Sequence, residues 1–236
     1  AFVQSYIKAG ANVNFVSPNG DNALYLSAKF GNFPVVNELL NGGCDANLGN
    51  GREKSPLVFA VLGNFPQVVS VLLSRGADTT IVLKDGQSIL MAACRAGPTA
   101  IVEALVKNGA RVNHADNFGG TPLMYAAISR KIEVVNIILK AGANLDAITD
   151  DGFSALMLSV SRGHEEIVEL LLSYGANTEL LDKLSKSALD LAELSEEWRC
   201  AELLVEYGAE MGRSGIRFSP QVLSARQRRL DVKEKI

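Results

Sequence analysis

Side chains that could carry out catalysis or bind a metal are few and far apart. The chain has two histidines, His114 and His164, and neither has a cysteine or glutamate at zinc-ligand spacing. No CxxC or HExxH motif occurs. The cysteines Cys44, Cys94 and Cys200 are odd in number and widely separated, which argues against a disulfide framework and favours a reducing compartment. We therefore expect no enzyme, no catalytic residue, no metal and no cofactor, and an intracellular, cytoplasmic location.

Two stretches look at first like phosphate-binding loops. "FGGTPLMYAA" (118–127) places two glycines before a Thr-Pro that opens an apolar run, and "GNGREKSPL" (49–57) is also rich in glycine. The second stretch lacks both the Gly-Lys-Ser/Thr ending and the preceding buried strand that such loops need. Asp150 and Asp151 before Gly152 form too short a segment for a calcium loop, whose ligands are spread over about twelve residues.

Composition permits a sizeable core but places charge unevenly. The chain has 236 residues, 47% of them hydrophobic, and a net charge of −3. Residues 212–236 carry seven basic against two acidic residues, whereas the preceding residues carry sixteen against twenty-four. No apolar run approaches the ~18 residues of a membrane span.

The strongest signal is an internal period of 33 residues. A leucine recurs at this spacing, and so does a glycine near the end of each unit. The leucines are Leu24, Leu57, Leu90, Leu123, Leu156 and Leu189, and the glycines are Gly10, Gly43, Gly76, Gly109, Gly142, Gly175 and Gly208. The register has no insertion or deletion, which indicates a repeat architecture.

Each unit predicts two helices. In the fourth, Thr121 can cap a helix, Pro122 suits its first position, and Leu123 begins the apolar face. A second helix carries a stripe of apolar residues and ends at Gly142, which can supply a left-handed backbone. The polar segment that follows suits a turn or hairpin. This pattern explains the stretch 118–127 without a phosphate.

The units "GGTPLMYAAISRKIEVVNIILKAGANLDA" and "DGFSALMLSVSRGHEEIVELLLSYGANTE" closely resemble the ankyrin repeat, a β-turn followed by two antiparallel helices. The resemblance implies an all-α solenoid of about six complete helix-turn-helix repeats plus a partial N-terminal one, linked by β-turn or hairpin loops. The ankyrin domain would cover residues 1–211, with a partial repeat at 1–14 and a last, acidic repeat acting as a cap. The chain begins within a predicted helix, so we expect an upstream segment. Glu53 and Ser185 replace the usual turn glycine and are expected to loosen those turns.

By the same resemblance, a protein partner would bind the concave side, through hairpin tips and the ends of the first helices. The matching positions lie six, five and three residues before each repeat's leucine, and five and six after it. The candidates are Phe30, Arg52, Lys54, Leu62, Lys84, Arg95, Phe118, Ile128, Phe153, Arg162 and Leu194. Several are large and apolar where solvated residues would be expected, and aromatic and Arg residues are typical interface anchors. The alternative is that the apolar members pack across neighbouring turns.

Residues 212–236 form a basic tail that can be helical from residue 220, with Ser219 as a cap and Pro220 in the first turn. Val222, Leu223, Leu230 and Val232 would give it a weak apolar face, and Arg226, Arg228 and Arg229 are its candidate binding residues. Three alternatives stay open. The tail is a solvated or disordered segment, a docking peptide for a second protein, or, least favoured, a segment that binds nucleic acid or an anionic membrane.

These observations predict a non-catalytic scaffold or adaptor that binds a partner protein on the concave surface. One alternative is a structural or regulatory subunit of a larger assembly. Another is the ankyrin segment of a multidomain protein whose catalytic or channel domain lies outside this sequence. Fold alone does not choose among them.

Overall fold

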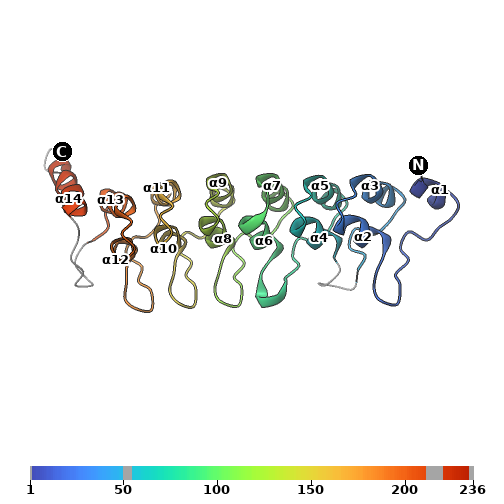
Figure 1. Cartoon of the computed structure of the whole chain (residues 1–236), viewed down its shortest axis with the longest axis horizontal. Coiled ribbons are helices and arrows are strands. Elements are labelled where there is room, and N and C mark those ends of the chain that lie inside the picture. The colour runs from blue at the N-terminus through green and yellow to red at the C-terminus, as the bar shows by residue number, and fades with distance from the viewer. Residues whose placement is uncertain (1, 50–54, 211–219, 234–236) are drawn as a thin grey trace. The chain divides into compact units, whose positions relative to one another are not determined.

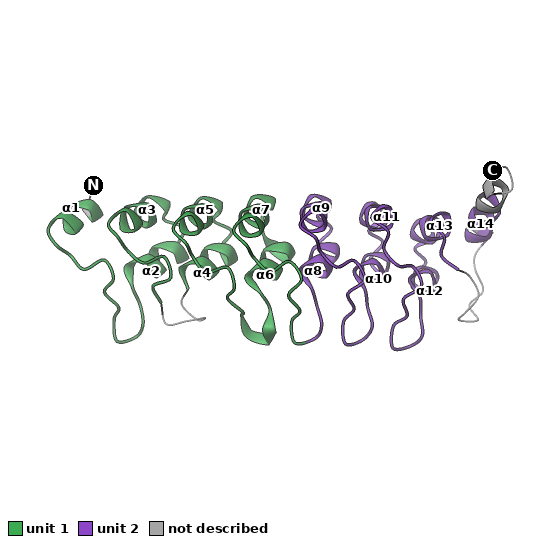
Figure 2. Cartoon of the chain, turned by 180° about the vertical axis from the view of Figure 1, so that it is seen from behind, with its two compact units in different colours: residues 1–117 green, residues 118–236 purple. Residues whose placement is uncertain are grey.

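The structure, a computed structural model, describes residues 2–49, 55–210 and 220–233. Within these ranges the regular elements are helices, together with one isolated antiparallel β-bridge between Val82 and Ser88, so the predicted all-α class is confirmed. The chain divides into two compact units, residues 1–117 and 118–236 (Figure 2). Among the described residues, none of the helices has both the length and the apolar character that crossing a membrane would require.

The described residues of unit 1 form one single helix followed by helix pairs (Figure 1). The elements are α1 (Phe2–Lys8), α2 (Ala23–Lys29), α3 (Phe33–Asn41), α4 (Pro56–Leu62), α5 (Pro66–Ser74), the short 3₁₀ helix η2 (Lys84–Gly86), α6 (Ile89–Ala96) and α7 (Thr99–Lys107). The first helices α2, α4 and α6 pack in one layer, and the second helices α3, α5 and α7 in another. The loops that join consecutive pairs extend from the first-helix side of the unit (Figure 1).

Unit 2 repeats this arrangement and adds one helix. Its elements are α8 (Pro122–Ile128), α9 (Ile132–Lys140), α10 (Ala155–Val160), α11 (Glu165–Ser173), α12 (Ala188–Leu194), α13 (Trp198–Tyr207) and α14 (Pro220–Lys233). Helix α14 packs against α13. Val222 and Ala225 of α14 are fully buried, whereas Leu223, expected on the apolar face, is 49% exposed.

The first helices begin where a small polar side chain can accept a backbone N–H. Ser154 accepts from the Met157 amide at 3.2 Å, and Asn22, Ser55, Ser88 and Ser187 cap their helices in the same way. Thr121 occupies the equivalent position but makes no cap hydrogen bond, and its buried hydroxyl has no partner. Thr121 thus stands at the expected N-cap position, but the side-chain hydrogen bond of a cap is absent in this repeat. Thr121 is the one β-branched residue among the six, and its extra methyl restricts rotation about χ1.

The repeated leucines form the core. Leu24, Leu57, Leu90, Leu123, Leu156 and Leu189 are each at most 1% exposed. After each second helix a glycine takes the left-handed backbone that was expected, as Gly142 does with φ 85° after α9. Ser185 keeps such a backbone without being glycine, with φ 58°, and Glu53 lies outside the described residues.

Candidate functional site

Two of the first helices of unit 1, α2 and α4, expose large apolar side chains. Phe30, the C-cap of α2, is 74% exposed, Leu62 at the end of α4 is 52% exposed, and Leu26 is 41% exposed. The opposite sides of these helices carry the buried leucines, so each helix is anchored by one face and leaves the other open. Neighbouring exposed apolar side chains of this size are a typical mark of a binding surface.

Next to these side chains lies a cluster of three rings around one lysine. The rings of Tyr25 and Phe59 meet edge to face, with centroids 5.1 Å apart. The ammonium of Lys29 lies 5.8 Å from the Tyr25 centroid, 5.9 Å from that of Phe30 and 5.8 Å from that of Phe59. Each such cation–π contact at an exposed site is worth ~0.5–1 kcal/mol. We call Tyr25, Lys29, Phe30 and Phe59 the aromatic cluster. In this cluster the positive charge of Lys29 lies beside apolar aromatic rings.

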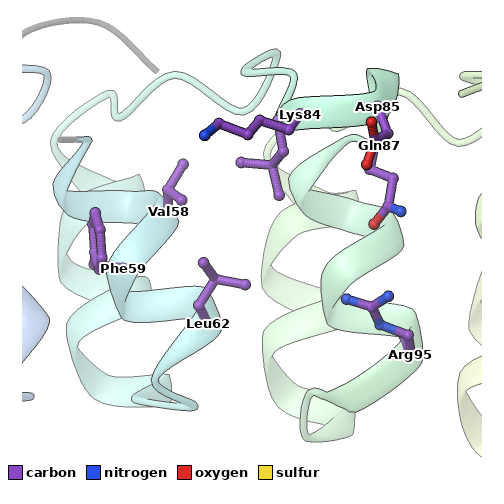
Figure 3. Close-up of a pocket in the computed structure, with 8 residues that line it drawn as sticks. Val58, Phe59, Leu62, Lys84, Asp85, Gln87 and Arg95 are labelled. Atoms are coloured by element: carbon purple, nitrogen blue, oxygen red, sulfur yellow. The ribbon is translucent and has the colours of Figure 1, made fainter. Parts of the chain in front are cut away.

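A groove of about 890 Å³ adjoins this cluster and shares Phe59 with it (Figure 3). Helix α4 supplies one wall, and η2 with its flanking residues and α6 supply the other. We call it the unit 1 groove, and its lining residues are Val58, Phe59, Leu62, Leu83, Lys84, Asp85, Gln87 and Arg95. The α4 wall is apolar, and the charged side chains of the groove come from the opposite wall.

The turn that forms this opposite wall is held on both of its sides. The Leu83 amide donates to the Gln87 carbonyl at 2.6 Å, and Asp85 takes a left-handed backbone with φ 62°. From the following repeat, the Asn117 amide donates to the Asp85 carbonyl at 3.1 Å, and His114 Nε2 lies 2.8 Å from the Gly86 carbonyl oxygen. The turn is therefore fixed in position before any ligand arrives, which reduces the entropy lost on binding.

One sequence-family model, described as ankyrin repeats in three copies, matches residues 1–82, 75–149 and 142–214. The chain is an ankyrin-repeat protein. Comparison with curated proteins gives no match. Ankyrin repeats are typically protein–protein interaction modules, and the 33-residue units and their paired helices are those of this family.

The sequence-predicted residues fall into separate parts of this ankyrin array. In unit 1, Leu62, Lys84 and Arg95 line the groove, and Phe30 belongs to the aromatic cluster. Arg52 and Lys54 lie outside the described residues.

In unit 2, Phe118 is 63% exposed at a hairpin tip, Leu194 is 59% exposed, and Arg162 is also exposed. Ile128 and Phe153 are only half-buried instead of fully exposed. Part of each of these two side chains is therefore covered by the protein.

Several exposed or groove-lining residues were missed, among them Phe59, Leu26 and Leu184. Phe59 and Leu26 each lie two residues after the repeat leucine, three positions nearer to it than the sites that the resemblance pointed to, so no family position indicated them. Leu184 is 78% exposed and shares its position in the repeat with Phe118, five residues before Leu189. That spacing could have identified Leu184.

The histidines and cysteines of the ankyrin array serve its structure. His164 Nδ1 lies 2.8 Å from the Ala127 carbonyl oxygen, which ties α11 to the preceding repeat. Among the described residues, no group of three or more His, Cys, Asp or Glu side chains is arranged to hold a metal ion. None of the three cysteines forms a disulfide, and all three are buried. Burial, with a smaller effect of Asp45, raises the pKa of Cys44 to about 11, and burial with Glu197 and Glu165 raises that of Cys200 to about 12. Neither thiol is set up as a nucleophile.

The arginines of α14 lie near acidic residues of α13. Arg228 Nη2 is 4.0 Å from Glu202 Oε1 and 4.0 Å from Glu206 Oε1. Arg226 is exposed, and the side chain of Arg229 is outside the described residues. The acidic face expected to cap the array thus contacts a further, basic helix.

Proposed function

We propose that this ankyrin-repeat protein is a non-catalytic scaffold or adaptor that binds a partner protein through the first-helix side of unit 1. This side corresponds to the surface through which the family binds its partners. The observation that carries the proposal is the continuity of the aromatic cluster with the unit 1 groove through Phe59. Together they place exposed apolar anchors beside fixed charges, which is the composition of an interface core with a polar rim.

Affinity capture with the full-length protein, read out by mass spectrometry, tests this proposal. The double variant Phe30→Ser/Leu62→Ser should lose the partner that the wild type retains, because both anchors are removed. Tyr6→Ser is the matched control: Tyr6 is 63% exposed on α1, away from the groove, and its variant should capture the partner normally. Equal capture by the double variant and the wild type would refute the proposed surface. Thermal melts of all three proteins show whether the folds are intact.

The three cysteines, none of which forms a disulfide, support a reducing, cytoplasmic location for this scaffold. Microscopy of the tagged full-length protein tests this directly, and a signal confined to a secretory compartment would contradict it.

A further inference from the structure

The unit 1 groove and the aromatic cluster combine positively charged side chains with apolar and aromatic ones. Lys84 and Arg95 line the groove, and Lys29 lies over Phe59, which the two features share. Among the described residues that line the groove, Asp85 is the single acidic one. The three cations and one carboxylate give this surface a local charge of +2, in a chain whose net charge is −3.

This local charge is a property of the first-helix layer in unit 1. Helices α2, α4 and α6 contain no Asp or Glu, and their charged residues are Lys29 and Arg95. The acidic residues on the described α-helices of unit 1 belong instead to second helices, as Glu38 on α3 and Glu103 on α7 do. On the first helices themselves an acidic ligand therefore meets cations and no carboxylate.

The cations are also held where a bound chain could reach them. The ammonium of Lys29 lies 5.8 to 5.9 Å from three ring centroids, and Lys84 extends from the η2 wall toward α4 (Figure 3). Val58 and Leu62 line the same groove as Lys84, and their side chains point into the space between α4 and α6 (Figure 3). The groove volume falls in the ~300–1,000 Å³ range of typical ligand pockets, enough for a few side chains but not for a folded domain.

We propose that the unit 1 groove and the aromatic cluster bind an extended peptide segment of the partner, in which apolar side chains are flanked by Asp or Glu. An apolar side chain packs on Val58 and Leu62, and its acidic neighbours pair with Lys84 and Arg95. A second apolar side chain packs on Phe30, beside the ammonium of Lys29. The inference rests on the proposed function and specifies the chemistry of the ligand: apolar contacts give the affinity, and the three cations select for acidic flanks.

Selection from a random 12-residue peptide library on the immobilised full-length protein tests this inference. The wild type should enrich peptides with Asp or Glu next to Leu, Ile, Phe or Met. Synthetic versions of the selected peptides are then measured by fluorescence anisotropy at low and high salt, where affinity should fall as ionic strength rises.

Charge variants locate the binding. Lys84→Glu/Arg95→Glu should weaken the selected peptides by about tenfold or more, because two attractive charges become repulsive. Asp85→Asn, which a left-handed backbone tolerates, should strengthen binding by about two- to fivefold. The matched control Lys107→Glu/Lys140→Glu makes the same charge change on exposed residues of second helices and should alter affinity by less than about twofold.

Three results would overturn the inference: selection of peptides without acidic residues, selection of no peptide, or affinities that Lys84→Glu/Arg95→Glu leaves unchanged. If any of these occurs while Phe30→Ser/Leu62→Ser still abolishes partner capture, the proposed function stands and only the ligand chemistry is wrong. If that double variant captures the partner normally, the proposed function itself fails.

Discussion

The side-chain oxygen Oδ1 of Asn47 accepts a hydrogen bond from the backbone amide of Asp78 at 2.7 Å, which joins two consecutive repeats. Nδ2 of the same side chain donates to the Gly76 carbonyl at 3.0 Å. Asn14 makes the same pair of contacts one repeat earlier, with the Asp45 amide at 2.9 Å and the Gly43 carbonyl at 3.4 Å. These side chains therefore connect neighbouring turns.

We expect Asn47→Ala to lower the free energy of unfolding by ~1–2 kcal/mol, because two inter-repeat hydrogen bonds are lost at ~0.5–1.5 kcal/mol each. Thr80 occupies the next equivalent position, and its hydroxyl donates to Asp78 Oδ1 within its own turn. Thr80→Asn should therefore raise stability by ~0.5–1 kcal/mol by adding the missing inter-repeat contacts. Urea unfolding measures both, and a destabilising Thr80→Asn would show that the turn at this position cannot admit them.

Phe118 and Phe153 should respond differently to truncation. Phe118 is 63% exposed, so Phe118→Ser should change stability by less than ~0.5 kcal/mol. Phe153 is half-buried, and Phe153→Ser should cost ~1–3 kcal/mol because packed apolar surface is lost. Leu123→Ala, at a position 1% exposed, sets the scale for a core truncation at ~2–5 kcal/mol. Thermal unfolding of the three variants gives the order, and equal losses at Phe118 and Phe153 would contradict it.

Stability should fall with rising pH because of two buried thiols. The pKa of Cys44 is raised from 9.0 to about 11 and that of Cys200 from 9.0 to about 12, in both cases first by burial. A raised pKa in the folded state contributes stability that is fully present below pH 9, where both states are protonated. Above pH 9 the unfolded chain loses its thiol protons first, so stability is lost from about pH 9 up to about pH 11 or 12.

The variant Cys44→Ala/Cys200→Val should flatten this dependence. Alanine fills the position of Cys44 in the other repeats, for example at Ala77 and Ala110, and valine fills that of Cys200 at Val35 and Val134, so both changes suit the packing. Unfolding curves at pH 8, 9 and 10 provide the measurement. An equally steep decline in the variant would assign the effect to other groups.

Adjacent residues of α14 offer a test of its packing on α13. Val222 is fully buried and Leu223 is 49% exposed. Val222→Asp should release α14, because an unpaired buried charge is costly, and should make the helix sensitive to proteases. Leu223→Asp introduces the same charge on the solvent side and should leave α14 protected. Rapid cleavage of both variants, or of neither, would contradict the packing seen here.

Much of this architecture could be predicted from the sequence because the repeat register fixes it. The repeat leucines had to be core, and each had to follow a helix start. The features that the sequence did not predict depend on contacts between repeats. The unit 1 groove depends on the left-handed backbone at Asp85 and on the support that Asn117 and His114 give from the next repeat, and no single unit encodes these features.

The hydrogen bonding of one helix cap and the buried face of the tail helix could not be predicted either. Thr121 matches a helix cap in residue type, yet its hydroxyl makes no cap hydrogen bond. The helical periodicity of the tail could not show which of its residues would face α13, and the small Ala225 is buried there while Leu223 is not.

Helix α14 also has a consequence for the surface that the last repeat presents. A stack of repeats is a one-dimensional lattice, and the outer face of its last layer has the shape to receive one more layer. At α13 that face is covered by α14, which has neither the second helix nor the hairpin of a repeat in the described residues. A second molecule that approaches this end meets a lone basic helix instead of a matching repeat. Among the described residues, the repeat pattern therefore gives way at α13 to a helix of a different kind, which occupies the position that a further second helix would take.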